Sequence, residues 1–241
     1  MGPFFDLHSH MLYGVDDGAD SRETMFSMLD ESYADGVRAL CLTPHYSPYH
    51  YGDTFDRASR SFEILSEYAR ERYPDLQLFL GHELGYYHGC EDAIRSGRCR
   101  MLASSRYVLV DFPAQVDFFE LSGAMQRLRS MGYLTVLAHA ERYRCLSHNF
   151  DWIREYVRSG GLIQINASGI CERWGSKTRT LWIRLVKEEL AHFVSSDGHN
   201  LSSRRPRVSV CMEYLQKHCP AEYVRALTWD NAWHIVKNGV L

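Results

Sequence analysis

The sequence predicts a parallel β/α barrel, on three observations. Short apolar segments alternate with segments of helical periodicity along the 241 residues, which is the pattern of βαβ units and a parallel sheet. Several apolar segments are rich in Val, Leu and Ile without alternation, as in strands buried on both faces. Seven such strands in about 200 residues favour a closed barrel over a doubly wound open sheet, the second choice.

The seven expected strands come at regular intervals along the chain. They cover residues 4–7, 37–43, 76–83, 107–112, 134–139, 162–166 and 192–197. The first helix is expected after Asp20, because Glu23 follows three residues later as in a capping box. Gly36 then supplies the stop. The apolar face of this helix comprises Met25, Met28, Leu29 and Tyr33.

The later connections repeat this apolar spacing of three and four residues. Helices are therefore expected over residues 55–69, 118–131, 152–157, 177–190, 207–217 and 229–237. Pro74 closes the second helix, Gly132 follows the third, and Gly160 follows the fourth. Each strand is thus followed by a helix or a loop that returns the chain to the start of the next strand.

The composition is that of one globular domain over residues 1–241. Hydrophobic residues make up 45% and charged residues 24%, which are ordinary values. The net charge of −3 gives no electrostatic case for a nucleic-acid partner. No run of about 18 apolar residues occurs, so no membrane insertion is expected, and the N-terminus lacks the features of a signal peptide.

The cysteine content favours a reducing compartment. The seven cysteines are odd in number and form no C-x-x-C pair, so free thiols in the cytoplasm are expected.

Potential metal ligands stand at the carboxyl ends of six of the seven strands, where barrel enzymes build their sites. One histidine there could be an ordinary core or surface residue, but six strand ends together indicate a metal centre. The candidates are His8, His10, Asp16 and Asp17 after the first strand, His45 after the second, Glu83 ending the third, Asp111 in the fourth, His139 ending the fifth, and Asp197 and His199 after the seventh.

The chemistry of these candidates narrows the metal. His8 and His10 are two residues apart in a strand, so both side chains point to one face and can grip one ion. Mixed imidazole and carboxylate ligands suit Mn, Fe or Zn, and no cysteine is present to build a thiolate site. The number of candidates predicts two or three divalent ions, which would activate water for a hydrolysis.

Three arginines follow these ligands closely in the sequence. Arg142 comes three residues after His139, and Arg204 and Arg205 follow His199. A guanidinium fork matches the geometry of phosphate, so these arginines predict a phosphoester substrate unless they are solvated surface residues.

An ordered set of motifs resembles a known superfamily. D-L-H-S-H, G-V-D-D-G, T-P-H, G-x-E, L-A-H-x-E-R-Y and S-D-x-H-N span residues 6–200 and are similar to the polymerase-and-histidinol-phosphatase (PHP) superfamily. Within it they resemble the CpsB-type bacterial protein-tyrosine phosphatases of capsule and exopolysaccharide operons. The resemblance implies a distorted seven-stranded (β/α) barrel with a trinuclear, usually manganese, centre.

The resemblance also implies a role for each residue that matches a motif. Glu83 would bridge two ions, and Arg142 with one of Arg204 and Arg205 would hold phosphate. The partner would be the tyrosine-phosphorylated tail of an autophosphorylating kinase in a membrane-bound complex; homo-oligomerisation stays open. The implied metal ligands are His8, His10, Asp17, His45, Glu83, Asp111, His139, Asp197 and His199.

Three positions depart from the family pattern. Asp111 stands where Glu is usual, which shortens the ligand by one methylene and puts one metal position in question. Ala140 replaces Pro, and Gly198 replaces Ala; both changes are interpreted as conformational.

A second motif competes with the metal centre. Residues 218–225 match H-C-x₅-R, the signature of cysteine-dependent tyrosine phosphatases. That loop must follow a strand and bind phosphate through backbone amides. Here Pro220 lacks an amide hydrogen and the preceding segment is helical, so Cys219 is expected to be an ordinary thiol. His82 is expected to be structural, and the loop 49–51 could contact substrate.

Three functions are compatible with these observations. The first is a phosphotyrosine-protein phosphatase, and the second is a small-molecule phosphatase such as a histidinol phosphatase. The third is a metal-binding module without turnover, which the full ligand set argues against. The CpsB-like details of the motifs favour the first.

Overall fold

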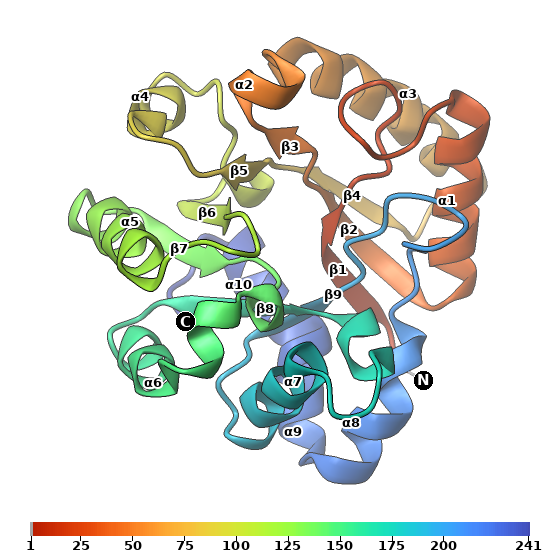
Figure 1. Ribbon diagram of the computed structural model, residues 1–241. Helices are drawn as coiled ribbons and strands as arrows, with labels where there is room; N and C mark the ends of the chain where they lie inside the picture. Colours follow the sequence, from red (N-terminus) through yellow and green to blue (C-terminus); the bar gives the residue numbers. More distant parts are fainter. Residues whose placement is uncertain (1) are drawn as a thin grey trace.

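The computed structural model describes residues 2–241 and shows a curled parallel sheet with helices on its outside (Figure 1). The strands are β1 (Phe4–Ser9), β2 (Val37–Leu42), β3 (His45–Tyr46), β4 (Gln77–Leu80), β5 (Glu83–Gly85), β6 (Tyr107–Asp111), β7 (Leu134–Leu137), β8 (Leu162–Asn166) and β9 (Phe193–Ser195).

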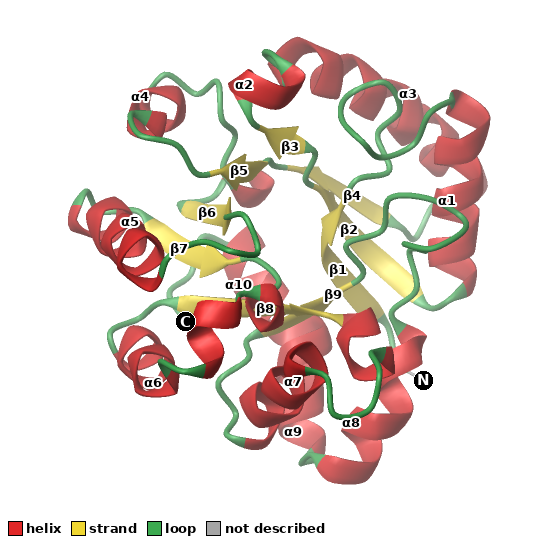
Figure 2. Ribbon diagram, in the orientation of Figure 1, coloured by secondary structure: helices red, strands yellow, loops and turns green. Residues whose placement is uncertain are grey.

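All the strand pairs are parallel. They form one hydrogen-bonded group of order β1-β2-β4 and another of order β3-β5-β6-β7-β8-β9. A parallel bridge between Ser9 and Gly198 then brings β1 beside the chain that leaves β9. The strands therefore follow one another around a curve, and their carboxyl ends share one edge (Figure 2). The predicted parallel α/β sheet is confirmed.

The predicted count of seven strands is not confirmed, because β3 lies beyond the predicted strand 37–43 and the predicted strand 76–83 is divided between β4 and β5. β2 and β3 are separated by Thr43 and Pro44, and proline has no amide hydrogen to give to a neighbouring strand. β4 and β5 are separated by Gly81 and His82. The His82 amide donates to the Arg100 carbonyl (3.1 Å) instead of to the sheet.

Every predicted helix is present, and three short ones were not predicted: α2, α4 and α9. The helices are α1 (Arg22–Ala34), α2 (Pro48–Tyr51), α3 (Phe55–Arg72), α4 (Cys90–Arg95), α5 (Phe118–Ser130), α6 (Phe150–Arg158), α7 (Lys177–Lys187), α8 (Met212–His218), α9 (Ala221–Arg225) and α10 (Asn231–Val236). Within the described chain, each helix is too short or too polar to cross a bilayer.

The starts of α1 and α8 differ from the predicted ones for reasons that the hydrogen bonds show. The N-cap of α1 is Ser21, whose hydroxyl accepts from the Thr24 amide (3.1 Å), whereas Asp20 accepts from the Thr24 hydroxyl (2.7 Å). α8 begins at Met212 and not near residue 207. The preceding amides of Val208 and Ser209 donate to the Asp35 carboxylate, at 2.7 and 2.9 Å, and a 3₁₀ turn over Ser209–Cys211 then leads into α8.

A buried apolar cluster closes the amino-terminal end of the sheet. It joins strand residues inside the curl of the sheet to the face of α10 that carries Ala232 and Ile235. The strand residues in this cluster include Phe5, Ala39, Tyr107, Leu162 and Phe193. With one end filled by α10, the opposite edge is left for polar side chains.

Candidate metal centre

Strand register brings the predicted ligands together at the carboxyl edge of the sheet. His45 of β3 lies directly beside Glu83 of β5, and Asp111 lies beside Gly85 one strand further on. In β1, a bulge between Asp6 and Ser9 interrupts the register with β2. Bulges re-aim side chains, and here the Nε2 atoms of His8 and His10 lie 3.0 Å apart. The prediction that both rings point to one site is confirmed.

Glu83 is the central residue of the site. Its buried carboxylate faces four imidazoles. Oε1 lies 3.3 Å from His8 Nε2 and 3.0 Å from His139 Nε2. Oε2 lies 3.2 Å from His10 Nε2 and 2.9 Å from His45 Nδ1. One carboxylate therefore contacts candidate ligands from three other strand ends.

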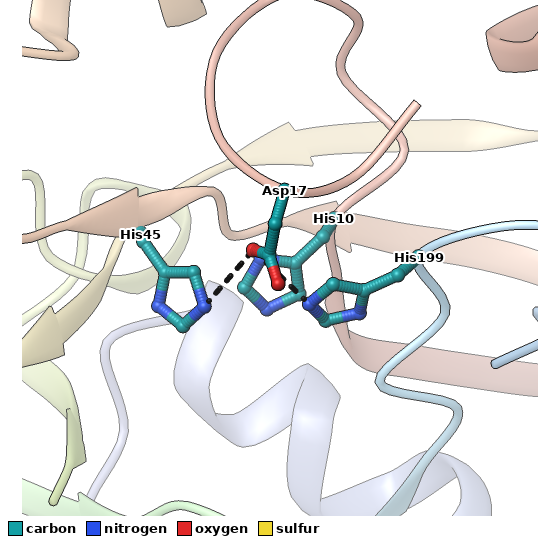
Figure 3. Close-up of side chains that lie close together, drawn as sticks. All are labelled: His10, Asp17, His45 and His199. Atoms are coloured by element: carbon teal, nitrogen blue, oxygen red, sulfur yellow. Dashed lines mark ion pairs between the residues drawn. The ribbon is translucent and has the colours of Figure 1, made fainter. Parts of the chain in front are cut away.

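Eight of the nine predicted ligands fall into three groups that share some members. Within each group, one donor atom from every residue lies within 4.8 Å of the others. Figure 3 shows the first group, in which the Asp17 carboxylate lies between two imidazoles, 3.5 Å from His45 Nε2 and 3.6 Å from His199 Nε2. His139 belongs to no group but lies 3.3 Å from Asp111. The groups are His10, Asp17, His45 and His199; His8, His10 and Asp197; and His45, Glu83 and Asp111.

Orphaned buried atoms test whether divalent ions fit these groups. Asp197 Oδ1 and His199 Nε2 are buried and have no hydrogen-bond partner. An unpartnered buried polar atom is costly, and a cation would satisfy both. Mixed nitrogen and oxygen donors are also the chemistry of divalent transition-metal sites. The residues present therefore fit such ions.

The pKa shifts of Glu83, His8 and His45 also indicate that the buried carboxylates need positive charge nearby. Burial alone would raise the pKa of Glu83, but His8 and His45 hold it well below its usual range. Burial would lower the pKa of His8, yet Glu83 and Asp197 raise it to about 9. The pKa of His45 rises to about 10, since Glu83 and Asp16 outweigh burial. Without cations, the buried carboxylates hold protons on the imidazoles instead.

The backbone is strained at two predicted ligands. His139 has φ 29° and Asp197 has φ 52°, in the left-handed region that non-glycine residues rarely adopt. Such strain persists only where surrounding contacts fix it, and it concentrates at functional sites. One fixing contact is the buried carboxylate of Asp6, which accepts from the amide of Ser196 (2.9 Å) next to Asp197.

A supporting layer of polar residues was missed from the sequence. Gln164 of β8 contacts His8 Nδ1 through its amide oxygen (3.0 Å) and accepts from the His139 amide (2.7 Å). Asn166, on the same strand face, donates to Asp197 Oδ2 (2.8 Å). The strand that supplies no predicted ligand therefore orients three of them, and its alternation of Gln and Asn was the available signal.

Asp16 is one of the candidates after the first strand, but the structure gives it a supporting position. Its Oδ2 contacts His10 Nδ1 (2.7 Å) and accepts from the His45 amide (2.8 Å). The carboxylate thereby fixes the tautomer of His10, whose Nε2 faces the site.

We expect Asp16→Asn to weaken metal binding by about 10- to 100-fold, because such a partner orients a ligating histidine and raises its basicity. Titration of the metal-free protein with Mn²⁺ measures this change. Asp20→Asn is the matched control, since Asp20 is an exposed carboxylate of the same loop. Equal affinities for the two variants would contradict the supporting role.

Two of the three predicted arginines lie at the candidate metal centre, and the third does not. Arg142 Nη1 lies 3.5 Å from Asp197 Oδ2, and Arg204 Nη2 lies 3.0 Å from the same oxygen. Arg205 instead pairs with Glu31 of α1 (2.7 Å), so its guanidinium is not brought to the ligands. A pocket of about 270 Å³ contains both Arg142 and Arg204 together with Asp17, His45, Glu83, Asp111 and His139.

The departures from the family pattern have local explanations at two positions. The shorter Asp111 still reaches the site and accepts from the Tyr143 hydroxyl (3.1 Å). At Gly198 a Cβ would stand 2.7 Å from Pro206 Cα, so close packing and not an unusual φ requires glycine here. Ala140 begins a 3₁₀ turn that ends at Arg142; nothing in the structure explains the change from proline.

His82 and the loop 49–51 lie next to candidate ligands. His82 is buried and accepts from the Arg100 amide (2.9 Å) through Nδ1, as expected of a structural histidine. The loop 49–51 forms most of α2. The ring of its Tyr51 stacks on that of His45 with centroids 5.4 Å apart, while Tyr49 is exposed.

Cys219 does not occupy a phosphate-binding loop. It follows α8 and not a strand, and burial raises the pKa of its thiol. It lines a separate cavity with apolar residues such as Phe4 and Val224. All seven cysteines are free, as predicted.

Comparisons with known proteins agree with this geometry. A family model described as "Capsular polysaccharide synthesis, CpsB/CapC" matches residues 4–237. The tyrosine-protein phosphatase CpsB of Streptococcus pneumoniae is 29% identical over 98% of this chain and 99% of its own length. The tyrosine-protein phosphatase YwqE of Bacillus subtilis is 26% identical over 97% and 91%.

A solved structure from work on YwqE of Bacillus subtilis and CpsB of Streptococcus pneumoniae superposes with a TM-score of 0.87. The two chains are 25% identical, and the match covers 98% of this chain and 96% of the other. Those two proteins are metal-dependent tyrosine phosphatases. The similarity thus extends over nearly the whole chain, and the family match over residues 4–237 spans the candidate metal centre.

Proposed function

The chain belongs to the CpsB/CapC family of capsular polysaccharide synthesis, and from this premise we propose that it is a metal-dependent protein-tyrosine phosphatase. The observation that carries the proposal is the convergence of Arg142 and Arg204 on Asp197, beside three groups of metal ligands. Guanidinium groups next to divalent ions form a site for a dianionic phosphoryl group.

Different residues of the site would have different roles in hydrolysis. Bound divalent ions would lower the pKa of water and neutralise phosphoryl oxygens. Arg142 and Arg204 would bind the non-bridging oxygens and orient the ester. Gln164 and Asp16 hold the ligating imidazoles in place. Tyrosine phenolate has a pKa near 10 and departs with little protonation, so the site needs no dedicated acid for an aryl phosphate.

Several finer features belong to the same proposal. Two or three ions, most suitably Mn²⁺, with Fe or Zn as alternatives, would occupy the ligands His8, His10, Asp17, His45, Glu83, Asp111, His139, Asp197 and His199. The curled sheet would be the distorted seven-stranded barrel of PHP proteins, with the chain acting as one catalytic domain. The substrate would be the tyrosine-phosphorylated tail of a capsule or exopolysaccharide kinase, met in the cytoplasm.

Matched peptides test this proposal. We expect kcat/KM for a phosphotyrosine peptide to exceed that for the same peptide with phosphoserine by about 100-fold on manganese-loaded enzyme, because an alkyl alcohol is a poorer leaving group than a phenol.

Histidinol phosphate belongs in the same assay. A clear preference for histidinol phosphate would assign the chain to small-molecule hydrolysis. Equal rates for the two peptides would show that the leaving group does not decide specificity.

A further inference from the structure

A second and larger cavity adjoins the metal centre. Its volume is about 950 Å³, against about 270 Å³ for the pocket at the ligands. Arg142, Arg204 and Ala114 line both cavities, so they form the boundary between them. A substrate whose phosphate lies between the two arginines therefore has room to continue into the larger cavity, which we call the basic groove.

The lining of the basic groove includes three cations without an ionic partner. Arg144 follows the 3₁₀ turn of Arg142, Arg173 precedes α7, and Lys177 is the first residue of α7. All three are exposed, and none forms an ion pair within residues 2–241. They differ in this from Arg205, which lines the same groove but is paired with Glu31.

The acidic residues of the groove do not balance these cations. Its lining contains Glu141, Glu172 and Asp197. Glu141 and Asp197 are buried, and Asp197 already contacts Arg142 and Arg204. Glu172 is the exposed acid of the lining. Three unpaired cations therefore face one exposed carboxylate, and the groove presents a positive potential to a ligand.

We propose that the basic groove is a second anion subsite, which binds an anionic side chain of the same peptide whose phosphotyrosine lies at the metal centre. The anion would be a second phosphotyrosine or an Asp or Glu flanking the first. This subsite rests on the proposed function, because it presumes a phosphotyrosine peptide in the adjoining pocket.

The shape of the groove favours a peptide as its occupant. The cations line a concavity that continues from the phosphate pocket, whereas a lipid surface would need them on a flat or protruding face. The groove is also several times larger than the pocket that would hold a single phosphoryl group. A chain entering from the metal centre would place its neighbouring residues against Arg144, Arg173 and Lys177.

Three peptides with one phosphotyrosine each would test the subsite. One has neutral flanks, one has Asp and Glu flanks, and one carries a non-hydrolysable phosphonate analogue of a second phosphotyrosine. We expect the wild-type enzyme to prefer both anionic peptides by about tenfold in kcat/KM, mainly through KM, since each exposed charge pair contributes modestly. The preference should shrink as salt rises. A preference for the phosphonate peptide alone would identify phosphate as the anion.

The variant Arg144→Gln/Arg173→Gln/Lys177→Gln should lose this preference while hydrolysing p-nitrophenyl phosphate within about twofold of the wild-type rate, because a small ester does not reach the groove. The control variant Arg60→Gln/Arg70→Gln/Lys217→Gln removes the same charge from α3 and α8 and should keep the preference. Equal use of all three peptides by the wild type, or an unchanged preference in the groove variant, would overturn the subsite.

Two further measurements separate the alternatives. Fluorescence anisotropy of the phosphonate peptide needs no turnover, so binding that depends on the groove in an enzyme inactive on aryl phosphates would contradict the proposed function and still support the subsite. Co-sedimentation with phosphatidylglycerol vesicles tests a lipid. Vesicle binding lost in the groove variant, with unchanged peptide preference, would assign the groove to a membrane and overturn the proposal.

Discussion

Removal of divalent metal should lower phosphatase activity by at least about 10³-fold, and Mn²⁺ should restore it better than Mg²⁺. The buried atoms Asp197 Oδ1 and His199 Nε2 have no hydrogen-bond partner, and a bound cation would satisfy them. Loss of the ions would also remove the positive charge that stabilises the negatively charged phosphoryl group in the transition state. Imidazole ligands favour Mn²⁺, whereas Mg²⁺ prefers carboxylates and water.

The measurement is turnover of p-nitrophenyl phosphate after chelation, dialysis and addition of one metal at a time, with metal content determined for each sample. Thermal unfolding provides a readout independent of activity. An ion that binds only the folded chain stabilises it by about 2.7 kcal/mol at a hundredfold excess over Kd. Full activity of a preparation shown to be free of metal would refute the metal-dependent function.

The convergence of the candidate ligands could be predicted because it depends on local patterns. A strand alternates its side chains, so His8 and His10 had to share a face, and parallel strands had to deliver His45 and Glu83 to one edge. The fold confirms both expectations, with His45 paired in register to Glu83. The motif spacing therefore carried most of the information about this cluster.

The supporting residues could not be predicted because their partners are remote in sequence. Gln164 contacts His8 across 156 residues, and only the curl of the sheet brings β8 near β1. Neighbouring residues also diverge. Arg204 turns to Asp197, while Arg205 finds Glu31 on α1, 174 residues away. Sequence spacing alone does not decide between two adjacent arginines.

The predicted count of seven strands was not confirmed, and the reason is again a contact that the local sequence does not reveal. The apolar run that includes residues 76–83 reads as one strand, and its composition contains no signal at His82 except polarity. In the structure the His82 amide and ring both bond to Arg100, so the ladder breaks there and resumes at Glu83. The break matters for the site, since Glu83 begins the new strand at the position from which it reaches four imidazoles.

Glu83→Gln should lower kcat/KM by at least about 10³-fold, which corresponds to a rise of about 4 kcal/mol in the activation free energy. It should also reduce the number of bound ions. Gln has nearly the same shape as Glu but lacks the charge that four imidazoles share. A neutral amide cannot offer two anionic oxygens to neighbouring ions. The substitution tests the centre of the cluster without opening a cavity, so circular dichroism should remain that of the wild type.

Cys219→Ser is the matched control for this experiment, because it removes the thiol of the competing H-C-x₅-R motif. Cys219 lies beside α8 and the apolar cavity, with its thiol pKa raised, so its loss should leave turnover within about twofold. Metal content and kcat/KM should be measured on both variants in the same preparation series. Normal turnover in Glu83→Gln would remove the carboxylate from the centre of catalysis, and a large loss in Cys219→Ser with unchanged metal content would restore the cysteine mechanism.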